Sequence, residues 1–509
     1  MYLFRTPGLK SIPFSLVLPG CLILVLSYPL FGQSESLAEK SRRAKELISA
    51  GQPEKAIPIY QELVRALPEN PGLIMDLGMA LSMAGRDQDA IKEFEAALRL
   101  NPHYPNALLF LAMAHLNLNQ PQKAVEPLQE VLAGQPQNEL ARWKLGEVYY
   151  ALENYTEAAR HYRELGQLNP QNPKAWYGLG RCYMSLSVSA SGKTRQLDPY
   201  SGYSLALFAE SYAEEHQYGA AFQLYRQAME RLPTLPGLHA AVADIYKKTG
   251  HPDWAAVEEE MDRRIGPSEC STQQPACDFQ AGRYDELIAP ARPQATAESS
   301  YWQSKAYYRM SVAAFARLSE LPPSAEFHEI KAQADADQEE FRACVEELQE
   351  ARNLSPNNPE IEKNLAIAFR RIGDQKDARE LLEELVKRQP GRSEANYLLG
   401  DNLLSLHQPA QAIPFLKKAL GLDPGLLVAH SSLAKAYLET GQAKEAIPHL
   451  EASLSTDSDG ALHYQLARAY QHEGQAARAE EMLKRYQEIR GAQAQEKKSP
   501  RIDPPPPLP

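Results

Sequence analysis

Residues 71–104 read PGLIMDLGMALSMAGRDQDAIKEFEAALRLNPHY, and they contain two apolar stripes with helical spacing. The first stripe is Ile74, Leu77, Gly78 and Leu81, and the second is Ala90, Phe94 and Ala97. Gly85 falls at a turn between the stripes, and Pro102 ends the second helix. The small residues Gly78 and Ala90 allow the two helix axes to approach closely. This segment therefore predicts an antiparallel helix pair.

Two series of residues repeat this pattern at a constant spacing of 34 residues. One series is Ala56, Ala90, Ala124 and Ala158, and the other is Pro68, Pro102, Pro136 and Pro170. A fixed period of this size indicates stacked copies of one supersecondary unit. A single helix pair cannot bury its own apolar face, so the copies must stack into a solenoid that is stabilised by contacts between neighbours.

The repeats resemble the tetratricopeptide repeat (TPR) family, whose pattern is W-x2-L-G-x2-Y…A-x3-F…P. The residues that match are Leu77, Gly78, Leu81, Ala90, Phe94, Ala97 and Pro102, and then Trp176, Leu179, Gly180 and Tyr183. The resemblance extends roughly from Leu37 to Arg490 and is of the bacterial exported type. It implies an all-α fold, a right-handed α-solenoid superhelix of stacked helix-turn-helix repeats.

The copies are not all regular. Predicted copies begin near Leu37, Pro71, Pro105, Glu139, Pro173, Gly202 and Pro236, and again near Ser299, Ala325, Pro359, Ser393, Leu427 and Gly460. The fifth copy reaches its terminal proline, Pro199, early, so we expect its second helix to be shortened or fused to the first. Trp302, Pro323 and Pro356 follow Trp176, Pro199 and Pro233 at similar offsets, which indicates a larger internal duplication.

These patterns predict a division into five segments. They are a signal peptide or N-terminal anchor at 1–32, an N-terminal TPR block at 33–265, an irregular interruption at 266–298, a C-terminal TPR block at 299–490 and a disordered Pro-rich tail at 491–509. Because the period lapses in the interruption, we expect a joint between two superhelical blocks there.

The N-terminal segment is typical of an export signal. Arg5 and Lys10 precede an apolar run that extends to Phe31, and this pattern predicts cleavage near Gly32. A lipoprotein at Cys21 is one alternative, and an uncleaved membrane anchor is another, because about 20 residues suffice to span a bilayer. The predicted location is therefore periplasmic or secreted, with a membrane-anchored form facing outside the cytoplasm as the alternative.

Composition and motifs argue against several classes of function. The formal net charge of −11 disfavours a nucleic-acid surface, which needs clustered Lys and Arg. Gly192-Lys193-Thr194 resembles the end of a phosphate loop, but Ser187 stands where that loop needs glycine. The histidines do not cluster at metal-ligand spacing, and no catalytic arrangement is evident. We therefore expect a non-enzyme without a cofactor, a metal site or a small-molecule substrate.

Two cysteines differ in context from the others. Cys182 and Cys344 lie inside predicted repeat helices and are interpreted as packing residues. Cys270 and Cys277 lie in the irregular interruption of an exported chain, where a disulfide can persist. A Cys270–Cys277 disulfide is one hypothesis, and a pair of free thiols is the other.

The resemblance implies a groove, because the first helices of TPR repeats line the concave face. Positions 5, 9 and 12 of each first helix form one stripe on that face. In the second to fifth copies this stripe is apolar, and the predicted groove residues are Met75, Met79, Leu109, Met113, Leu116, Trp143, Tyr150, Tyr177 and Met184. The C-terminal positions are more polar, with Lys363, Arg370, Asp401, Ser431 and Lys435. The alternative is that part of this stripe packs against the first helix of the next repeat, and it applies most of all to Met75 and Leu109.

The sequence thus predicts a protein-binding scaffold or adaptor outside the cytoplasm, which holds an extended peptide or a partner's helix along its concave face. Aromatic side chains and methionines are suited to such a surface. One alternative is a structural part of a cell-envelope or secretion assembly, tethered to the membrane by the N-terminal segment. The other is a helper region associated with an enzyme such as a glycosyltransferase.

Overall fold

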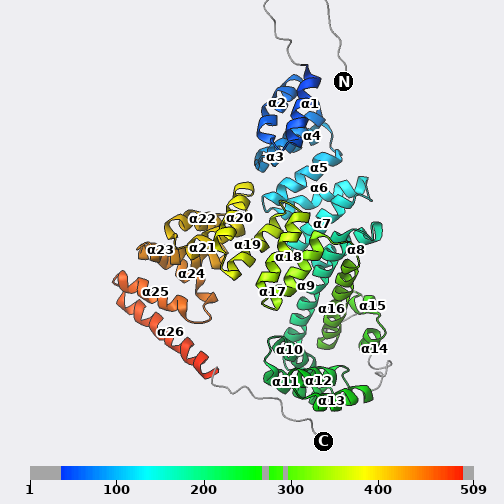
Figure 1. Cartoon of the computed structure of the whole chain (residues 1–509), viewed down its shortest axis with the longest axis vertical. Coiled ribbons are helices and arrows are strands. Elements are labelled where there is room, and N and C mark those ends of the chain that lie inside the picture. Colours follow the sequence, from blue (N-terminus) through cyan, green and yellow to red (C-terminus); the bar gives the residue numbers. More distant parts are fainter. Residues whose placement is uncertain (1–35, 266–273, 290–295, 497–509) are drawn as a thin grey trace, which may run out of the picture.

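We describe the protein from a computed structural model, which covers residues 36–265, 274–289 and 296–496. Within these ranges the chain forms 26 α-helices, one short 3-10 helix and no strand (Figure 1). The helices pack in sequence-adjacent pairs that stack along the chain, so the all-α solenoid is confirmed. In the same ranges no helix is long and apolar enough to cross a membrane.

The first four repeats form a regular stack at the top of Figure 1. Their helices are α1 (Leu37–Ser49), α2 (Pro53–Ala66), α3 (Pro71–Met83), α4 (Asp87–Leu100), α5 (Pro105–Asn117), α6 (Pro121–Gly134), α7 (Glu139–Ala151) and α8 (Tyr155–Leu168). Local chemistry sets the ends of α3. The Asn70 side chain accepts hydrogen bonds from the first backbone N–H groups, Pro71 occupies the first helical position, and Gly85 adopts a φ of +73° in the turn.

A glycine on the first helix of a repeat receives a large side chain from the second. A Cβ atom at Gly78 would lie 2.6 Å from the Phe94 ring, and one at Gly146 would lie 2.9 Å from the Tyr162 ring. Both ring residues follow their glycine by the same sequence spacing, so this contact is a feature of the repeat. It explains why the eighth position of these first helices is small.

The fifth repeat breaks this rule. Its helix α9 (Pro173–Leu197) continues without a turn, so of the two predicted alternatives, a shortened or a fused second helix, fusion is the one observed. The ring that covers Gly180 comes from Phe315, on the distant helix α16 (Ala297–Ser319). The two long helices lie side by side in Figure 1 and pack along most of their length. The fifth repeat is therefore completed by a helix that comes more than a hundred residues later.

Small side chains line the seam between α9 and α16. They are Gly180, Ser187, Ala190 and Thr194 on α9, and Ser300, Ser304, Ser311 and Ala314 on α16. The Ser187 hydroxyl donates a hydrogen bond of 2.8 Å to the Ser304 carbonyl oxygen. Because Gly180 meets Phe315 while Ser187 meets Ser304, the two helices are antiparallel.

The chain between these helices forms a side module, which in Figure 1 lies at the lower end of the pair (α10 to α13) and to the right of α16 (α14 and α15). The module contains α10 (Gly202–Glu214), α11 (Tyr218–Arg231), α12 (Leu238–Lys248), α13 (Pro252–Arg264), α14 (Gln274–Gln280) and α15 (Tyr284–Ile288). Its apolar core includes Tyr301 and Trp302 from the start of α16. One half of α16 thus belongs to the module, while the other half completes the fifth repeat.

The main stack continues from α9 directly to the C-terminal arm, at the left of Figure 1. The arm contains α17 (Ala325–Asp337), α18 (Phe341–Leu354), α19 (Pro359–Ile372), α20 (Gln375–Arg388), α21 (Ser393–Ser405), α22 (Pro409–Leu422), α23 (Leu427–Glu439), α24 (Ala443–Ser453), η1 (Leu454–Thr456), α25 (Ala461–His472) and α26 (Ala476–Glu496). Helix α17 packs against α9, where Lys174 and Glu326 form an ion pair of 3.2 Å.

This arrangement differs from the predicted joint between two blocks. The interruption at 266–298 contains α14 and α15, and α16 begins inside it, at Ala297. The two parts of the main stack meet through α9, α16 and α17, and the described part of the interruption belongs to the side module. Helix α26 also runs past Arg490 into the predicted tail. The predicted signal at 1–32 and the rest of the tail lie outside the described residues.

Candidate functional site

The first helices of the main stack share one side of the molecule, which we call the inner surface. It is formed by α3, α5, α7 and α9, and then by α17, α19, α21 and α23. Neighbouring first helices touch directly in several places, including α7 with α9 and α9 with α17. The inner surface therefore runs through the junction, although α9 and α17 are far apart in the sequence.

The structure separates the nine predicted groove residues by burial. Met75 and Leu109 are only 7% and 8% exposed and belong to the apolar cores between repeats. Their assignment to the groove is corrected, because they pack against the neighbouring helices. Partly exposed residues are Met79, Met113, Leu116, Trp143, Tyr150 and Tyr177, and Met184 is exposed. These seven have the access that a ligand requires, and their contact with one stays a prediction.

Two lysines flank the ring of Trp143. The Nζ atoms of Lys144 and Lys174 each lie 3.8 Å from the ring centroid. Lys144 comes from α7 beside Trp143, whereas Lys174 comes from the start of α9. A cation at this distance is attracted by the ring quadrupole. The tryptophan is thereby held in place on the inner surface before any partner arrives.

Arg181 lies over two further aromatic rings. Its guanidinium carbon is 4.3 Å from the Tyr150 centroid and 5.3 Å from the Tyr177 centroid. Burial raises the pKa of Tyr177, and the nearby Glu329 carboxylate raises it further. In the described part of the chain, no carboxylate lies within ion-pair distance of Arg181, and the side chain is exposed. The site thus presents an arginine on an aromatic platform.

Helix α17 adds two carboxylates that sequence reasoning did not assign to this site. Glu326 pairs with Lys174, and Glu329 lies beside Tyr177 and Arg181. Burial, together with the neighbouring Glu326, raises the pKa of Glu329 to about 7. The only sequence signal for the position of α17 is the internal duplication, in which Trp302 and Pro323 correspond to Trp176 and Pro199. This duplication does not indicate that α17 follows α9 in space.

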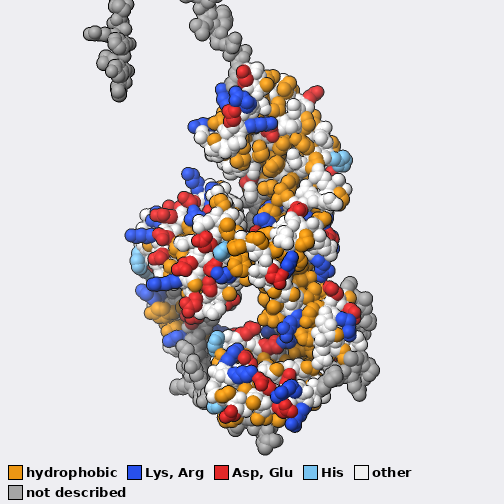
Figure 2. All heavy atoms as spheres, turned by 45° about the vertical axis from the view of Figure 1, so that its right-hand side comes forward, with side chains coloured by type: hydrophobic (Ala, Val, Ile, Leu, Met, Phe, Trp, Pro, Cys, Tyr) orange, Lys and Arg blue, Asp and Glu red, His pale blue; other side chains and the backbone are white. Residues whose placement is uncertain are grey.

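The inner surface of the C-terminal arm is built differently. Lys363 lies 2.8 Å from Glu360 and 3.4 Å from Glu394, and Arg370 pairs with Asp401 of the next repeat. The Lys363–Glu394 and Arg370–Asp401 pairs connect the neighbouring first helices α19 and α21, so these charges are largely satisfied within the chain. Figure 2 shows the same contrast, with hydrophobic side chains gathered over the N-terminal repeats and many charged ones on the arm.

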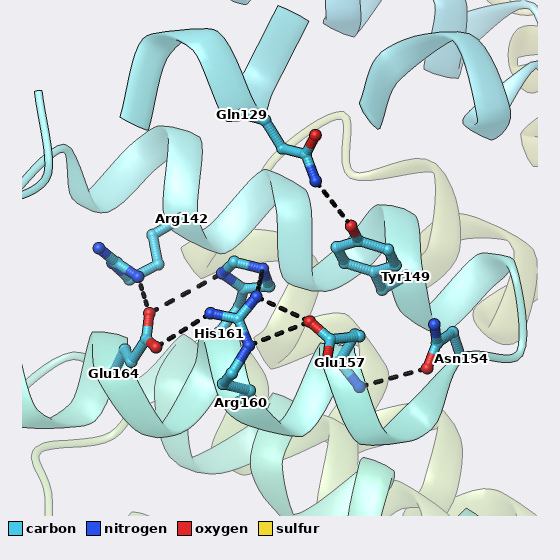
Figure 3. A network of polar contacts seen from close by, with 8 residues as sticks. All are labelled: Gln129, Arg142, Tyr149, Asn154, Glu157, Arg160, His161 and Glu164. Carbon is cyan, nitrogen blue, oxygen red and sulfur yellow. Dashed lines mark hydrogen bonds and ion pairs between the residues drawn. The ribbon is translucent and has the colours of Figure 1, made fainter. Parts of the chain in front are cut away.

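A polar network joins α7 and α8, and it reaches α6 through Gln129, which donates a hydrogen bond of 2.9 Å to the Tyr149 hydroxyl (Figure 3). It contains Gln129, Arg142, Tyr149, Asn154, Glu157, Arg160, His161 and Glu164. His161 is buried, stacks on Tyr149 and lies with Nε2 3.0 Å from Nη2 of Arg160. A guanidinium can only donate, so Nε2 accepts and the ring proton resides on Nδ1. Burial and the two arginines lower the pKa of His161 to about 4.

This network holds two helices of one repeat together. Arg142 of α7 forms an ion pair with Glu164 of α8, and Arg160 bonds to both Glu157 and Glu164. The neutral His161 is enclosed by these groups, with its Nδ1 atom 4.0 Å from Glu164. We therefore interpret the network as packing within the repeat.

The described cysteines fall into two groups, free thiols inside the repeats and a bonded cysteine in the interruption. Cys182 and Cys344 are buried free thiols, and burial raises the pKa of Cys182 to about 12, which disfavours a reactive thiolate. Cys277 is disulfide-bonded, whereas Cys270 lies outside the described residues, so the Cys270–Cys277 pairing stays a prediction. Among the described residues, no three His, Cys, Asp or Glu side chains are close enough together to hold a metal ion.

Comparison with protein families gives repeated matches along the chain. Models described as "Tetratricopeptide repeat" match residues 41–105, 75–139, 109–173, 144–187 and 363–426, residues 403–461, and residues 460–485. Together these ranges cover about half of the chain. A curated relative, tetratricopeptide repeat protein 21B of Xenopus laevis, is 28% identical over 158 residues. The match spans 30% of this chain but only 12% of the length of that relative.

Solved structures with similar helices are shorter proteins. One structure, described as MamA 41-end from Desulfovibrio magneticus RS-1, is 22% identical, with a TM-score of 0.31, and the match covers 33% of this chain and 96% of the chain in that structure. YrrB, described as a TPR protein with an unusual peptide-binding site, is 19% identical with a TM-score of 0.29. That match covers 33% of this chain and 90% of YrrB.

Proposed function

Because the chain belongs to the tetratricopeptide repeat family, we propose that it is a non-catalytic scaffold or adaptor that binds a peptide or helix of a partner protein on its inner surface. The proposal rests on the exposed chemistry of that surface. It offers aromatic rings, methionines and one arginine on rigid helices, and such residues dominate the binding energy of protein interfaces.

One observation carries the proposal, which is the position of Arg181 over Tyr150 and Tyr177. The ring contacts restrict the arginine, so little rotamer entropy is lost when a partner binds. The Arg181 residue is exposed, and no carboxylate of the described chain is within ion-pair distance. A partner can therefore add a charge-assisted hydrogen bond beside an apolar contact without first displacing an internal ion pair.

The charged pairs of the C-terminal arm favour a different role for that region. Lys363 is paired with two glutamates, and Arg370 is paired with Asp401, so a ligand would have to break these ion pairs in order to bind the charges. We therefore assign the main contact to α7 and α9 together with α17. The arm then supplies the rigid continuation of the stack.

The proposed location outside the cytoplasm rests on the sequence of residues 1–32. Mass spectrometry of the protein from fractionated cells tests it. A mature chain that begins near Gln33 is expected in the periplasmic or secreted fraction. A full-length chain in membranes would instead support the tether, and a full-length chain in the cytosol would contradict export.

Binding is tested with peptides selected from a random 12-residue phage library against the whole protein. Affinities are then measured by fluorescence anisotropy for the wild type, for Trp143→Ala combined with Tyr177→Ala, and for the control Tyr464→Ala. Tyr464 is 44% exposed on α25, away from the proposed contact. We expect the double variant to lose at least about 2 kcal/mol of binding free energy, with melting near that of the wild type. Unchanged affinity would place binding elsewhere.

A further inference from the structure

An exposed apolar patch lies on the paired helices α9 and α16. Its four residues are Met184 and Val188 on α9, and Tyr308 and Val312 on α16, which are 37%, 64%, 49% and 45% exposed. On each helix the two residues are four positions apart, so they are neighbours on one helical face. Large apolar side chains that remain this exposed beside one another indicate an interaction surface.

The two halves of the patch lie on the same side of the helix pair. On α9, Met184 follows Tyr183, which is buried and stacks on Tyr307 of α16, and Val188 follows the seam residue Ser187. On α16, Val312 follows the seam residue Ser311 in the same way. On both helices the exposed residue follows a seam residue by one position. Two antiparallel helices with this arrangement are related by a local two-fold axis that is perpendicular to the plane containing both helix axes. Rotation about this axis moves the α9 residues onto the α16 residues and keeps them on the same side of the helix pair. The four residues therefore form one patch.

Each stripe continues into a packed neighbour. Along α9 the stripe leads back through Arg181 and Tyr177 to α17. Along α16 it leads back through Lys305 and Tyr301 to α10, where Lys305 pairs with Glu210 and Tyr301 contacts Tyr203. The patch is therefore a shallow apolar floor between α10 and α17, continuous with the inner surface at Arg181.

Two arginines bracket this floor along α9. Arg181 lies over Tyr150 and Tyr177 at one end, and Arg195 lies 5.3 Å from the Phe208 centroid at the other. They are 14 residues apart, which is about 21 Å along a helix. In the ranges that the structure covers, neither has a carboxylate at ion-pair distance, whereas the nearby Lys174 and Lys305 do. At neutral pH Glu329 is partly protonated, so it neutralises Arg181 only in part.

We propose that this patch binds an amphipathic helix of a partner protein, with the apolar face of that helix on Met184, Val188, Tyr308 and Val312 and with carboxylates near its ends paired to Arg181 and Arg195. The inference rests on the proposed scaffold function and names the class of partner. Charge complementarity selects an acidic helix over a basic one, and the apolar floor supplies most of the buried area.

The test uses two synthetic fluorescein-labelled peptides of 18 residues and the whole protein. Both peptides carry leucine at helical spacing on one face. One has glutamate at its remaining positions near both ends, and the other has lysine there. Fluorescence anisotropy is expected to show at least tenfold tighter binding of the acidic peptide, and this preference should decrease with added salt.

Variants separate the apolar floor from the charges. Val188→Glu and Val312→Glu should each weaken the acidic peptide at least tenfold, whereas Val428→Glu, a valine of equal exposure to Val312 on α23, should leave its affinity unchanged. The single variant Arg195→Glu should reduce the preference for the acidic peptide over the lysine peptide. The double variant with Arg181→Glu should reduce this preference further or invert it. The three valine variants should melt near the wild type, because those side chains are exposed.

Several outcomes would overturn the inference. They are equal binding of the two peptides, no effect of Val188→Glu and Val312→Glu, or a concentration-dependent dimer in sedimentation that Val188→Glu abolishes, since a second copy would then be the occupant. If phage-selected peptides still bind through Trp143 and Tyr177 while the acidic helix does not bind, only this inference fails. If neither binds, the proposed function fails with it.

Discussion

The hydroxyl of Ser187 bonds to the backbone carbonyl of Ser304 across a gap of 117 residues. This buried contact lies in the α9–α16 seam, about two turns of α9 away from the Gly180–Phe315 contact that completes the fifth repeat. In a regular repeat the two helices are joined by a short turn, so their pairing costs little loop-closure entropy. Here the whole side module closes the loop, and the pairing depends on a non-local contact that we expect to form late in folding.

Two glycines of α9 test the completion of the fifth repeat by α16. A Cβ at Gly180 would overlap the Phe315 ring, whereas one at Gly192 would meet no heavy atom within 4 Å. Gly180→Ala should therefore destabilise the protein by about 1–3 kcal/mol through overpacking. The matched change Gly192→Ala should stabilise it by about 0.5–1 kcal/mol, because glycine is unfavourable inside a helix. Urea unfolding measures both, and a harmless Gly180→Ala would contradict the pairing.

Glu329 makes the junction between α9 and α17 sensitive to pH. Its pKa of about 7 in the folded protein lies above the ordinary value of 4.5, because burial and Glu326 disfavour the charged form. Stability is therefore fully present below about pH 4.5 and is lost as the pH rises through about 7, by about 3 kcal/mol at most. Glu329→Gln should remove this loss.

The measurement is the midpoint of urea unfolding at pH 5.5 and pH 8. The control is Glu326→Gln, which removes the ion pair with Lys174 and should bring no gain at pH 8. A wild type with the same stability at both values, or a Glu329→Gln protein that keeps the full alkaline loss, would show that the carboxyl is not buried as described.

His161 should make the stability of the folded protein depend on pH in the acid range, with a loss of stability as the pH falls rather than as it rises. Its pKa of about 4 lies below the ordinary value of 6.5, because burial and the guanidinium groups of Arg160 and Arg142 disfavour the imidazolium. The folded state should lose stability as the pH falls from 6.5 to 4, by about 2 kcal/mol at pH 4.5. His161→Phe keeps a ring against Tyr149 and should reduce this acid loss.

Thermal melting at pH 7.5 and pH 4.5 gives the difference. His103→Phe serves as the control, since the His103 side chain is 87% exposed and should leave the acid loss as it is in the wild type. An acid loss of equal size in His161→Phe would assign the sensitivity to other groups.

The predicted Cys270–Cys277 disulfide should show in the pattern of thiol labelling. Without reductant, a maleimide in denaturant should modify Cys182 and Cys344 and spare Cys270 and Cys277. Reduction should make all four reactive. Because the loop is short, its stabilisation should lie at the low end of roughly 0–5 kcal/mol. Modification of both Cys270 and Cys277 in the unreduced protein would rule the bond out.

Much of the fold could be predicted because repeat starts carry local signals. Predicted starts near Pro71, Pro105, Glu139 and Pro173 coincide with α3, α5, α7 and α9, and those near Pro359, Ser393 and Leu427 with α19, α21 and α23. Proline at the first helical position and a side-chain cap from the preceding asparagine act within one turn, so they can be recognised without knowledge of packing.

The candidate site could be predicted less well. Positions 5, 9 and 12 mark one face of each first helix, and seven of the nine chosen residues do retain exposure there. Met75 and Leu109 have the same spacing as the others but pack against neighbouring helices. Helical period tells which residues share a face, but how far that face is covered depends on the angle and distance of the next helix.

The residues by themselves determined the helix pair, the repeat, the solenoid and a fifth repeat whose second helix is either shortened or fused to the first, because each follows from local spacing, capping and turn chemistry. Only the tertiary structure decided that α16 completes that repeat, that α17 follows α9 in space, and that Glu326 and Glu329 join the aromatic and basic residues of the inner surface. The physical reason is that apolar and small-residue stripes are interchangeable between repeats. Which stripe meets which is settled by the packing of the whole chain, and no local pattern records it.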